Sequence, residues 1–323
     1  MAQITIIGLD TLGISLGLAL RKTAQPPTVV GIDKEGANAR RAQQLGAVDR
    51  TEGWISSGVK DAALVVLNEP FSRLRDILEG ISENLPQGCV VTCTAPLIVP
   101  VLGWADQFLP GGASFVAGHP IINPAKSAAE PSAELFQQAQ FCIVASSKAS
   151  PAAMDLVSSL ATAIGAQPFF LDAAEHDGLM TAVEGLSGLL GTLLMSAAAE
   201  TSSWRDVRRL AGATFAQATA TAEADPADQA LALRANRDNL ARWLQVLQAK
   251  LEDTRIALLA EEDQPLTKLL TDAREARDLW LRDSHGADWE SVAEAPKVSM
   301  GEMLSHLILP QRQPPDKGDK KRR

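Results

Sequence analysis

The 323-residue chain contains no tyrosine, and aromatic residues make up only 4% of it. Mechanisms that rely on a tyrosine acid or base are therefore excluded, including the Tyr–Lys pair of short-chain dehydrogenases. Cysteine is scarce too, with Cys89, Cys93 and Cys142 as the complete set. They have neither the spacing of a metal site nor that of a secreted disulfide framework, so we expect no metal and a reducing cytoplasm.

Basic charge is also in short supply. The chain has 30 Lys and Arg against 39 Asp and Glu, a net charge of -9, so we expect no nucleic-acid-binding surface. The longest apolar run, Leu186 to Ala199, is shorter than a membrane span and contains serine and threonine. We therefore expect a buried helix there and no membrane contact. The N-terminus leads directly into a strand pattern, without the pattern of a signal peptide.

The chain does contain a strand, Gln3 to Gly8, that leads into Gly8-Leu-Asp-Thr-Leu-Gly13 and then into an apolar helix. This nearly repeats the dinucleotide-binding fingerprint G-x-G-x-x-G. Its glycines make the turn, admit the pyrophosphate and pack helix on strand. Gly8 and Gly13 hold the first and third places, whereas Asp10 holds the second. The sequence predicts a nucleotide-binding scaffold with a carboxylate where the diphosphate would lie.

The segments that follow this motif fit the same unit. A helix pattern continues to Leu20, and a second strand covers 28–33. Asp33 ends that strand at about the 20-residue distance where an acid binds the adenosine ribose hydroxyls. Such an acid favours NAD over NADP, because it would repel a 2′-phosphate. A βαβ unit without any ligand is the alternative, since Asp10 counts against binding.

Strand and helix patterns alternate through the first half of the chain. This alternation predicts an α/β fold with a doubly wound parallel sheet and helices on both faces. After about Asp172 the strand patterns disappear and helical spacing takes over. We therefore expect a dinucleotide-binding domain at 1–172, a helical domain at 173–285 and a tail at 286–323 with a disordered end. The expected strands cover about 3–8, 28–33, 62–67, 88–94, 114–118, 140–145 and 166–171, and the main helices of the second half about 227–260 and 266–282.

Short sequence pieces, in order over about residues 2 to 260, match one known family. On these pieces the chain resembles the prephenate/arogenate dehydrogenase family, the oxidoreductases of tyrosine biosynthesis. The pieces are Gly8-Leu-x-x-Leu-Gly13 with Ser15-Leu-x-Leu-Ala-Leu20, Val30-Gly-Ile-Asp33, Leu45-Gly-Ala-Val-Asp49, Leu64-Val-Val-Leu67 with Pro70, Phe115-Val-Ala-Gly-His-Pro-Ile121, Glu175-His-Asp177 and Ala224-Asp-Pro226.

The resemblance implies a Rossmann-type domain followed by an all-α dimerisation domain, a homodimer, and NAD as cofactor. It implies an oxidative decarboxylation in which a hydride passes from prephenate or arogenate to NAD(P)+ with loss of CO2. His119 matches the family histidine that contacts the ring hydroxyl, and a neutral imidazole is suited to accept that proton. The alternative for His119 is a strand-end histidine that bonds only to backbone.

Several positions depart from the family pattern. Cys93 and Pro96 stand where the family usually has Asp and Ser, and Gly185 and Gly188 stand in place of two histidines. Ala220 takes the place of the arginine that pairs with the substrate carboxylate. A carboxylate buried without its cation costs several kcal/mol. The nearby arginines are expected on solvated helix faces: Arg205, Arg208, Arg209, Arg234 and Arg237.

The cofactor side departs as well, because Asp10 and Glu69 add negative charge near the pyrophosphate position. We expect weakened NAD binding. Three hypotheses follow from the sequence. The first is an NAD-dependent prephenate/arogenate dehydrogenase with His119 as acid–base group and possible impairment of activity. The second is a non-catalytic homologue that serves as a binding or regulatory module. The third is a related two-domain oxidoreductase with a less charged substrate.

Overall fold

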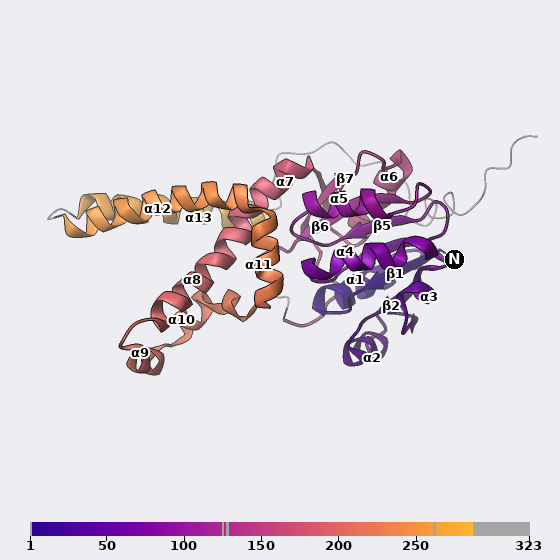
Figure 1. Cartoon of the computed structure of the whole chain (residues 1–323), viewed down its shortest axis with the longest axis horizontal. Coiled ribbons are helices and arrows are strands. Elements are labelled where there is room, and N and C mark those ends of the chain that lie inside the picture. Colours follow the sequence, from indigo (N-terminus) through magenta and orange to yellow (C-terminus); the bar gives the residue numbers. More distant parts are fainter. Residues whose placement is uncertain (1, 125, 127–128, 261–262, 287–323) are drawn as a thin grey trace, which may run out of the picture.

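The computed structural model describes residues 2–124, 126, 129–260 and 263–286. Figure 1 shows a layered α/β part on one side and a group of helices on the other. All strands lie in the first part, and every described element from α7 onward is helical. The predicted tail lies outside the described residues except for Gly286.

The eight strands form one sheet in the order β3-β2-β1-β4-β5-β6-β7-β8. Along this order, all neighbouring strands from β3 through β2, β1, β4 and β5 to β6 pair in parallel. Strand β7 runs antiparallel to β6, and β8 is parallel to β7. The predicted doubly wound sheet is confirmed, with one reversal at β7. The strands are β1 (Gln3–Ile7), β2 (Thr28–Ile32), β3 (Arg50–Thr51), β4 (Ala62–Leu67), β5 (Val90–Cys93), β6 (Ser114–Ile121), β7 (Gln140–Ala145) and β8 (Gln167–Phe170).

Two hydrophobic cores lie on opposite faces of the sheet, because neighbouring side chains of a strand point to opposite faces. In β4, Leu64 and Val66 join one core, and Val65 and Leu67 join the other. Helices cover both faces, which is why the strands are continuous apolar runs. The first core contains side chains of α1 (Thr11–Arg21), α2 (Gly36–Gln44) and α6 (Pro151–Ala163), and the second contains those of α3 (Ile55–Val59), α4 (Phe71–Ile81) and α5 (Val99–Phe108).

Strand β6 is longer than predicted. It pairs with β5 only at Ser114 and Phe115, whereas Val116 to Ile121 pair with β7. The expected strand end at Gly118 is therefore wrong, because β7 supplies hydrogen-bonding partners past that point. His119 therefore lies within β6, in the part of this strand that no longer pairs with β5.

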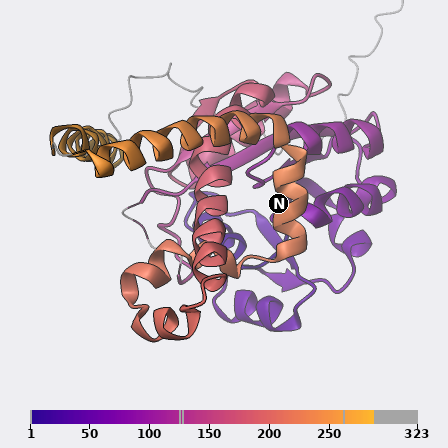
Figure 2. The same ribbon diagram turned by 60° about the vertical axis from the view of Figure 1, so that its left-hand side comes forward.

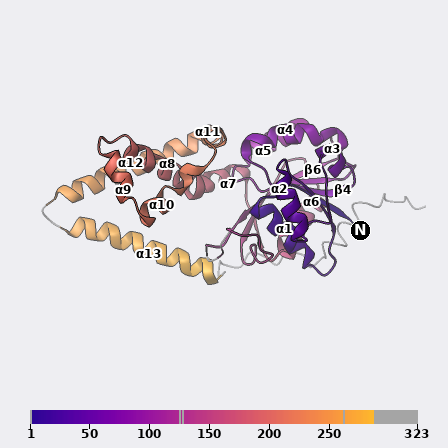
Figure 3. The same ribbon diagram turned by 90° about the horizontal axis from the view of Figure 1, so that it is seen from below.

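The helical part consists of a rod, a compact turn region and a long hairpin (Figures 1 and 2). The predicted helix at 227–260 is broken at Asn236, which ends one helix and begins the next. Figure 3 shows α12 running away from the sheet and α13 returning toward it. The elements are η1 (Ser82–Asn84), α7 (Ala173–Met180), the π-helix η2 (Thr181–Leu186), α8 (Ser187–Ala199), α9 (Trp204–Leu210), α10 (Ala213–Ala218), η3 (Ala220–Glu223), α11 (Pro226–Ala235), α12 (Arg237–Leu259) and α13 (Gln264–Gly286).

The rod formed by α7, η2 and α8 is a continuous 27-residue helical run, Ala173–Ala199. By length and composition alone it could cross a membrane, and only 11% of its most apolar window is buried. The expectation of a short, buried helix is therefore wrong, because the helix extends well before Leu186 and much of it faces outward. Its exposed large apolar side chains are Leu179, Val183, Leu190, Leu193 and Leu194.

Two aspartates of the helical part cap helices of the layered part. Neither α4 nor α5 has a side-chain cap of its own. Asp228 on α11 accepts a hydrogen bond from the N–H of Ser72 in the first turn of α4 (2.7 Å). Asp177 on α7 accepts from the N–H groups of Ile98 and Val99 at the start of α5, both at 2.8 Å. These caps satisfy helix-terminal donors and fix how the two parts meet.

Candidate active site

The turn between β1 and α1 brings backbone very close to backbone. Gly8 has φ +97°, and a Cβ there would lie 1.7 Å from the carbonyl oxygen of Asn68. A Cβ on Gly13 would lie 2.1 Å from the carbonyl oxygen of Gly8. A larger residue at Gly8 would push the turn away from the end of β4, and one at Gly13 would push α1 away from the turn. The turn therefore has the close packing that a dinucleotide-binding turn requires.

Asp10 is the N-cap of α1. Its Oδ1 accepts hydrogen bonds from the N–H groups of Leu12 (2.9 Å) and Gly13 (3.0 Å) and from the Asn68 amide (2.7 Å). In this fold the same helix N-terminus holds the pyrophosphate. The carboxylate therefore occupies donors that a diphosphate would use. Because Asp10 is exposed, its side chain has room to turn away into solvent.

Asp33 lies just beyond the end of β2, beside the same turn. It accepts hydrogen bonds from the N–H groups of Leu9 and Glu35, both at 2.7 Å. Glu69 lies next to it and pairs with Arg73 at 2.7 Å. Burial raises the pKa of Glu69, and the negative charges of Asp33 and Asp10 add to this, although Arg73 and Lys34 oppose it.

The residues around the β1–α1 turn and the end of β2 fit NAD. The glycine turn provides the close approach, the start of α1 provides N–H donors, and Asp33 ends β2 at the place from which such an acid bonds to a ribose hydroxyl. The carboxylate of Asp33 disfavours a 2′-phosphate. What departs from the usual arrangement is the charge of Asp10 at the pyrophosphate position.

His119 is buried on β6 and contacts a second histidine from the helical part. Its Nδ1 lies 3.1 Å from Nε2 of His176, which is completely buried on α7. The Nδ1 of His176 lies 2.9 Å from Oδ1 of Asp177. His119 therefore bonds to side chains and not merely to backbone. Asp177, His176 and His119 thus form a chain of side-chain contacts from the start of α5 to the end of β6.

Glu184 stands on the other side of His119. Its Oε1 lies 3.5 Å from Nε2 of His119. Glu184 belongs to the π-helix η2, and such segments are frequent at functional sites. Burial raises its pKa, but the hydrogen bond that His119 donates when protonated, and the positive charge that His119 and His176 then carry, outweigh burial, and the net pKa of Glu184 lies below the usual value.

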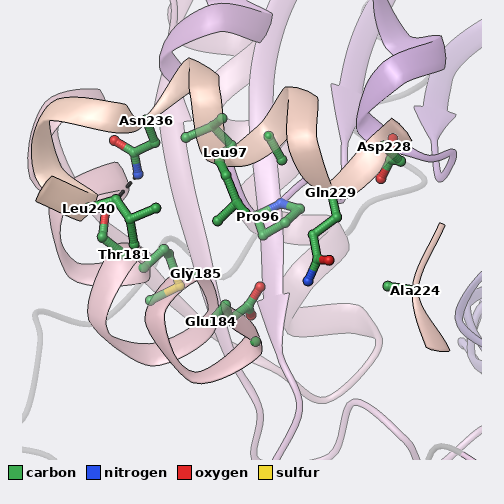
Figure 4. A pocket seen from close by; sticks show the side chains of 14 residues that line it. Pro96, Leu97, Thr181, Glu184, Gly185, Ala224, Asp228, Gln229, Asn236 and Leu240 are labelled. Atoms are coloured by element: carbon green, nitrogen blue, oxygen red, sulfur yellow. Dashed lines mark hydrogen bonds between the residues drawn. The ribbon is translucent and has the colours of Figure 1, made fainter. Parts of the chain in front are cut away.

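A pocket of about 240 Å³ opens beside Glu184, between the rod, α11 and the start of α5. Figure 4 shows Glu184 and Gln229 at the pocket, with Asn236 bonded to Thr181. The described lining residues include two carboxylates, Glu184 and Asp228, and no Lys, Arg or His. The lining consists of Pro96, Leu97, Met180, Thr181, Glu184, Gly185, Gly188, Ala224, Asp228, Gln229, Ala232, Leu233, Asn236 and Leu240.

Three positions that depart from the family pattern line this pocket. Pro96, Gly185 and Gly188 line it, whereas Ala220 lies exposed in η3 and does not. Of the four glycines of the rod, Gly191 alone is tightly packed, since a Cβ there would lie 2.2 Å from the hydroxyl of Thr221. The arginines expected on solvated faces are exposed: Arg205, Arg208, Arg209, Arg234 and Arg237.

Neither metal nor thiolate chemistry has a basis in the described part of the chain. It contains no cluster of three His, Cys, Asp or Glu side chains that could hold a metal ion. Burial raises the pKa of Cys93 to about 12 and that of Cys142 to about 11, so both thiols remain protonated. The titratable groups at or near the pocket include the imidazole of His119 and the carboxylates of Glu184 and Asp228.

Sequence reasoning missed His176, Asp177, Glu184 and Asn68 as members of these sites. The piece Glu175-His-Asp177 contributed to the family resemblance, but no role was assigned to it. Adjacent His and Asp at the start of a helix were the available signal, since the Asp172 N-cap marks that start. Nothing in the sequence indicated that His176 meets His119.

Comparison with known proteins gives a consistent result. The family model described as "Prephenate dehydrogenase, nucleotide-binding domain" matches residues 16–169. The model described as "Prephenate dehydrogenase, dimerization domain" matches residues 172–272. The prephenate dehydrogenase of Bacillus subtilis is 25% identical over 278 residues, which cover 85% of this chain and 75% of that protein.

Solved structures show the same fold at lower identity. Prephenate dehydrogenase from A. aeolicus, in complex with hydroxyphenyl propionate and NAD+, gives a TM-score of 0.75 at 20% identity, covering 86% of this chain and 97% of that one. Synechocystis arogenate dehydrogenase gives a TM-score of 0.67 at 20% identity, covering 86% and 99%. The arrangement of an α/β part followed by helices is therefore shared with these enzymes.

Proposed function

Because this chain belongs to the prephenate dehydrogenase family, we propose that it is an NAD-dependent dehydrogenase of prephenate or arogenate in tyrosine biosynthesis. The observation that carries the proposal is His119, whose Nε2 faces the pocket-lining Glu184 while its Nδ1 is held by His176. NAD, when bound, supplies the acceptor for the hydride. Gly8, Gly13 and Asp33 would hold it, and Asp10 would weaken the contact.

The part of this chain in the reaction is placement and proton transfer. His119 accepts the proton of the substrate hydroxyl at Nε2, and the buried surroundings exclude bulk water from that atom. The pocket beside Glu184 receives the substrate ring, since its walls are largely apolar. We take residues 1–172 as the cofactor-binding domain and 173–285 as the helical domain of this enzyme.

The pocket charge favours a second candidate, a non-catalytic homologue that binds a ligand or a partner. Substrates with two carboxylates need cations, and the described lining of the pocket offers Glu184 and Asp228 instead. The cap formed by Asp10 on α1 points the same way, because it competes with the diphosphate. The charge of the pocket and the Asp10 cap affect how tightly ligands bind, whereas His119 supports a chemical reaction.

We also propose that the protein is a homodimer in the cytoplasm. The matched dimerization-domain model covers residues 172–272, and the rod carries exposed leucines along its length. A second copy of the rod would cover these exposed leucines, so no lipid is needed to cover them. Three free, buried cysteines agree with a reducing compartment. We propose that neither nucleic acid nor membrane is a partner.

Steady-state kinetics test the function directly. NADH absorbance is followed with prephenate and with arogenate, for the wild type and for His119→Asn. Turnover with either substrate that falls by about 10²- to 10⁴-fold in the variant supports the dehydrogenase. No turnover with either substrate from a folded dimer contradicts it and leaves the binding module.

A further inference from the structure

We propose that His176 and Asp177 are positioning residues that fix the tautomer of His119 and direct its Nε2 lone pair toward the pocket. The inference deepens the proposed function, since it concerns the proton acceptor of that reaction. It rests on three contacts that join the two parts of the molecule: Asp177 to α5, Asp177 to His176, and His176 to His119.

The first step is the carboxylate of Asp177, which is buried and accepts two backbone hydrogen bonds at the start of α5. An ionised carboxylate can only accept hydrogen bonds. Its Oδ1 lies 2.9 Å from Nδ1 of His176, so that nitrogen must carry the hydrogen. In neutral His176 the lone pair is then on Nε2.

The position of the hydrogen on His176 determines the position of the hydrogen on His119. Its Nδ1 lies 3.1 Å from Nε2 of His176, and two facing nitrogens share one hydrogen. Because His176 Nε2 accepts, the hydrogen belongs to Nδ1 of His119. Neutral His119 therefore has its lone pair on Nε2, the nitrogen that faces Glu184, which lines the pocket. This is the tautomer that can take a proton from a hydroxyl.

The third step concerns charge after the transfer. When the substrate O–H bond breaks, its proton forms an N–H bond at Nε2, and His119 becomes a cation that keeps Nδ1–H bonded to His176. The Oε1 of Glu184, 3.5 Å from Nε2, then faces a positive charge. The neighbouring thiols add no competing charge, since burial raises the pKa of Cys142 to about 11 and of Cys93 to about 12.

The substitution His176→Phe tests the chain of hydrogen bonds by removing the acceptor at Nδ1 of His119. The carboxylate of Glu184 remains on the other side, with its Oε1 3.5 Å from Nε2 of His119. Neutral His119 should then carry its hydrogen on Nε2, where it can no longer take a proton.

Nitrogen NMR of protein labelled at histidine reads the tautomer without any substrate. We expect wild-type His119 to carry hydrogen on Nδ1 and the His176→Phe variant to carry it on Nε2. We expect kcat to fall by about 10²- to 10⁴-fold with KM changed by less than about threefold, because the wrong tautomer impairs proton transfer and not binding. The matched control is Asp172→Asn, an N-cap on the same helix that Asn replaces well; it should leave tautomer and kcat unchanged.

Wild-type His119 that is neutral and protonated on Nε2 would overturn the inference, and so would an unchanged tautomer in a folded His176→Phe protein. If that variant does not fold, the tautomer of the wild type alone decides the inference. A wild type without turnover contradicts the dehydrogenase proposal alone, since the NMR result still decides the role of His176 and Asp177.

Discussion

The carboxylate of Asp10 accepts a hydrogen bond from the backbone N–H of Gly13 at 3.0 Å, three residues along the chain. With Leu12 and Asn68 as further donors, it occupies the start of α1. A helix N-terminus can serve one anion at a time. The side chain that stabilises the helix is therefore the one that competes with the pyrophosphate of NAD.

Replacing this carboxylate should strengthen cofactor binding. We expect Asp10→Gly to lower the Kd for NAD+ by about tenfold, which corresponds to about 1.4 kcal/mol, measured by calorimetric titration. Loss of the cap should cost about 1 kcal/mol of unfolding free energy. Asp10→Asn is the control, because it keeps the cap and removes the charge, and it should give an intermediate Kd. An unchanged Kd for Asp10→Gly would show that the carboxylate is no obstacle.

A cation placed in the pocket should favour an anionic substrate. Gln229 lines the pocket on α11, opposite Gly188. We expect Gln229→Arg to lower the Kd for prephenate by about tenfold or more, since a charge-assisted hydrogen bond to a carboxylate contributes about 1.5 kcal/mol or more. Gln229→Met has a similar length without charge and should not tighten binding. Equal affinities of the two variants would mean that the substrate carboxylates lie elsewhere.

Glu184 should make stability depend on pH in the acidic range. Its pKa in the folded protein lies below the ordinary value of 4.5, mainly because the hydrogen bond and charge of His119 outweigh burial. The stabilisation is therefore present above about pH 4.5 and is lost as pH falls through the lowered pKa. Because the side chain is 44% exposed, the effect should stay below about 1 kcal/mol.

Urea unfolding of the wild type and of Glu184→Gln measures this effect. The difference in unfolding free energy should favour the wild type near pH 6 and shrink toward about pH 3. A difference that grows as the pH falls would reverse the sign and contradict the pairing of Glu184 with His119.

The contact between Asp228 and α4 should stabilise the junction of the two parts. We expect Asp228→Ala to lower the unfolding free energy by about 0.5–2 kcal/mol, because the N–H of Ser72 loses its acceptor. Asp228→Asn keeps an oxygen acceptor and should lose less. If both variants lost the same amount, the cap would not be the source of the stability.

Local patterns in the sequence were enough to predict the sheet and the first turn. Val65 and its neighbours form a continuous apolar run because both faces of β4 are covered. Gly8 and Gly13 stand out because close backbone contacts require them. The reversal at β7 could not be predicted, since strand direction depends on a connection that carries no periodic pattern.

The site was less predictable, because it forms from residues far apart in the chain. His119 and His176 are 57 positions apart, and Asp177 bonds to a helix start 79 positions away. Their meeting depends on how the helical part docks on the sheet. The position of Asp10 was read correctly as a departure from the fingerprint, but its role as the cap of α1 required coordinates.

The proposed function makes His119 the acceptor of the hydroxyl proton in an NAD-dependent oxidation with loss of CO2. A single turnover, with enzyme in excess over prephenate or arogenate, measures NADH and CO2 together. We expect equal amounts of both products from one of the two substrates, and neither product from His119→Asn on the same time scale. Equal yields from His119→Asn and the wild type, or CO2 released without NADH, would contradict it.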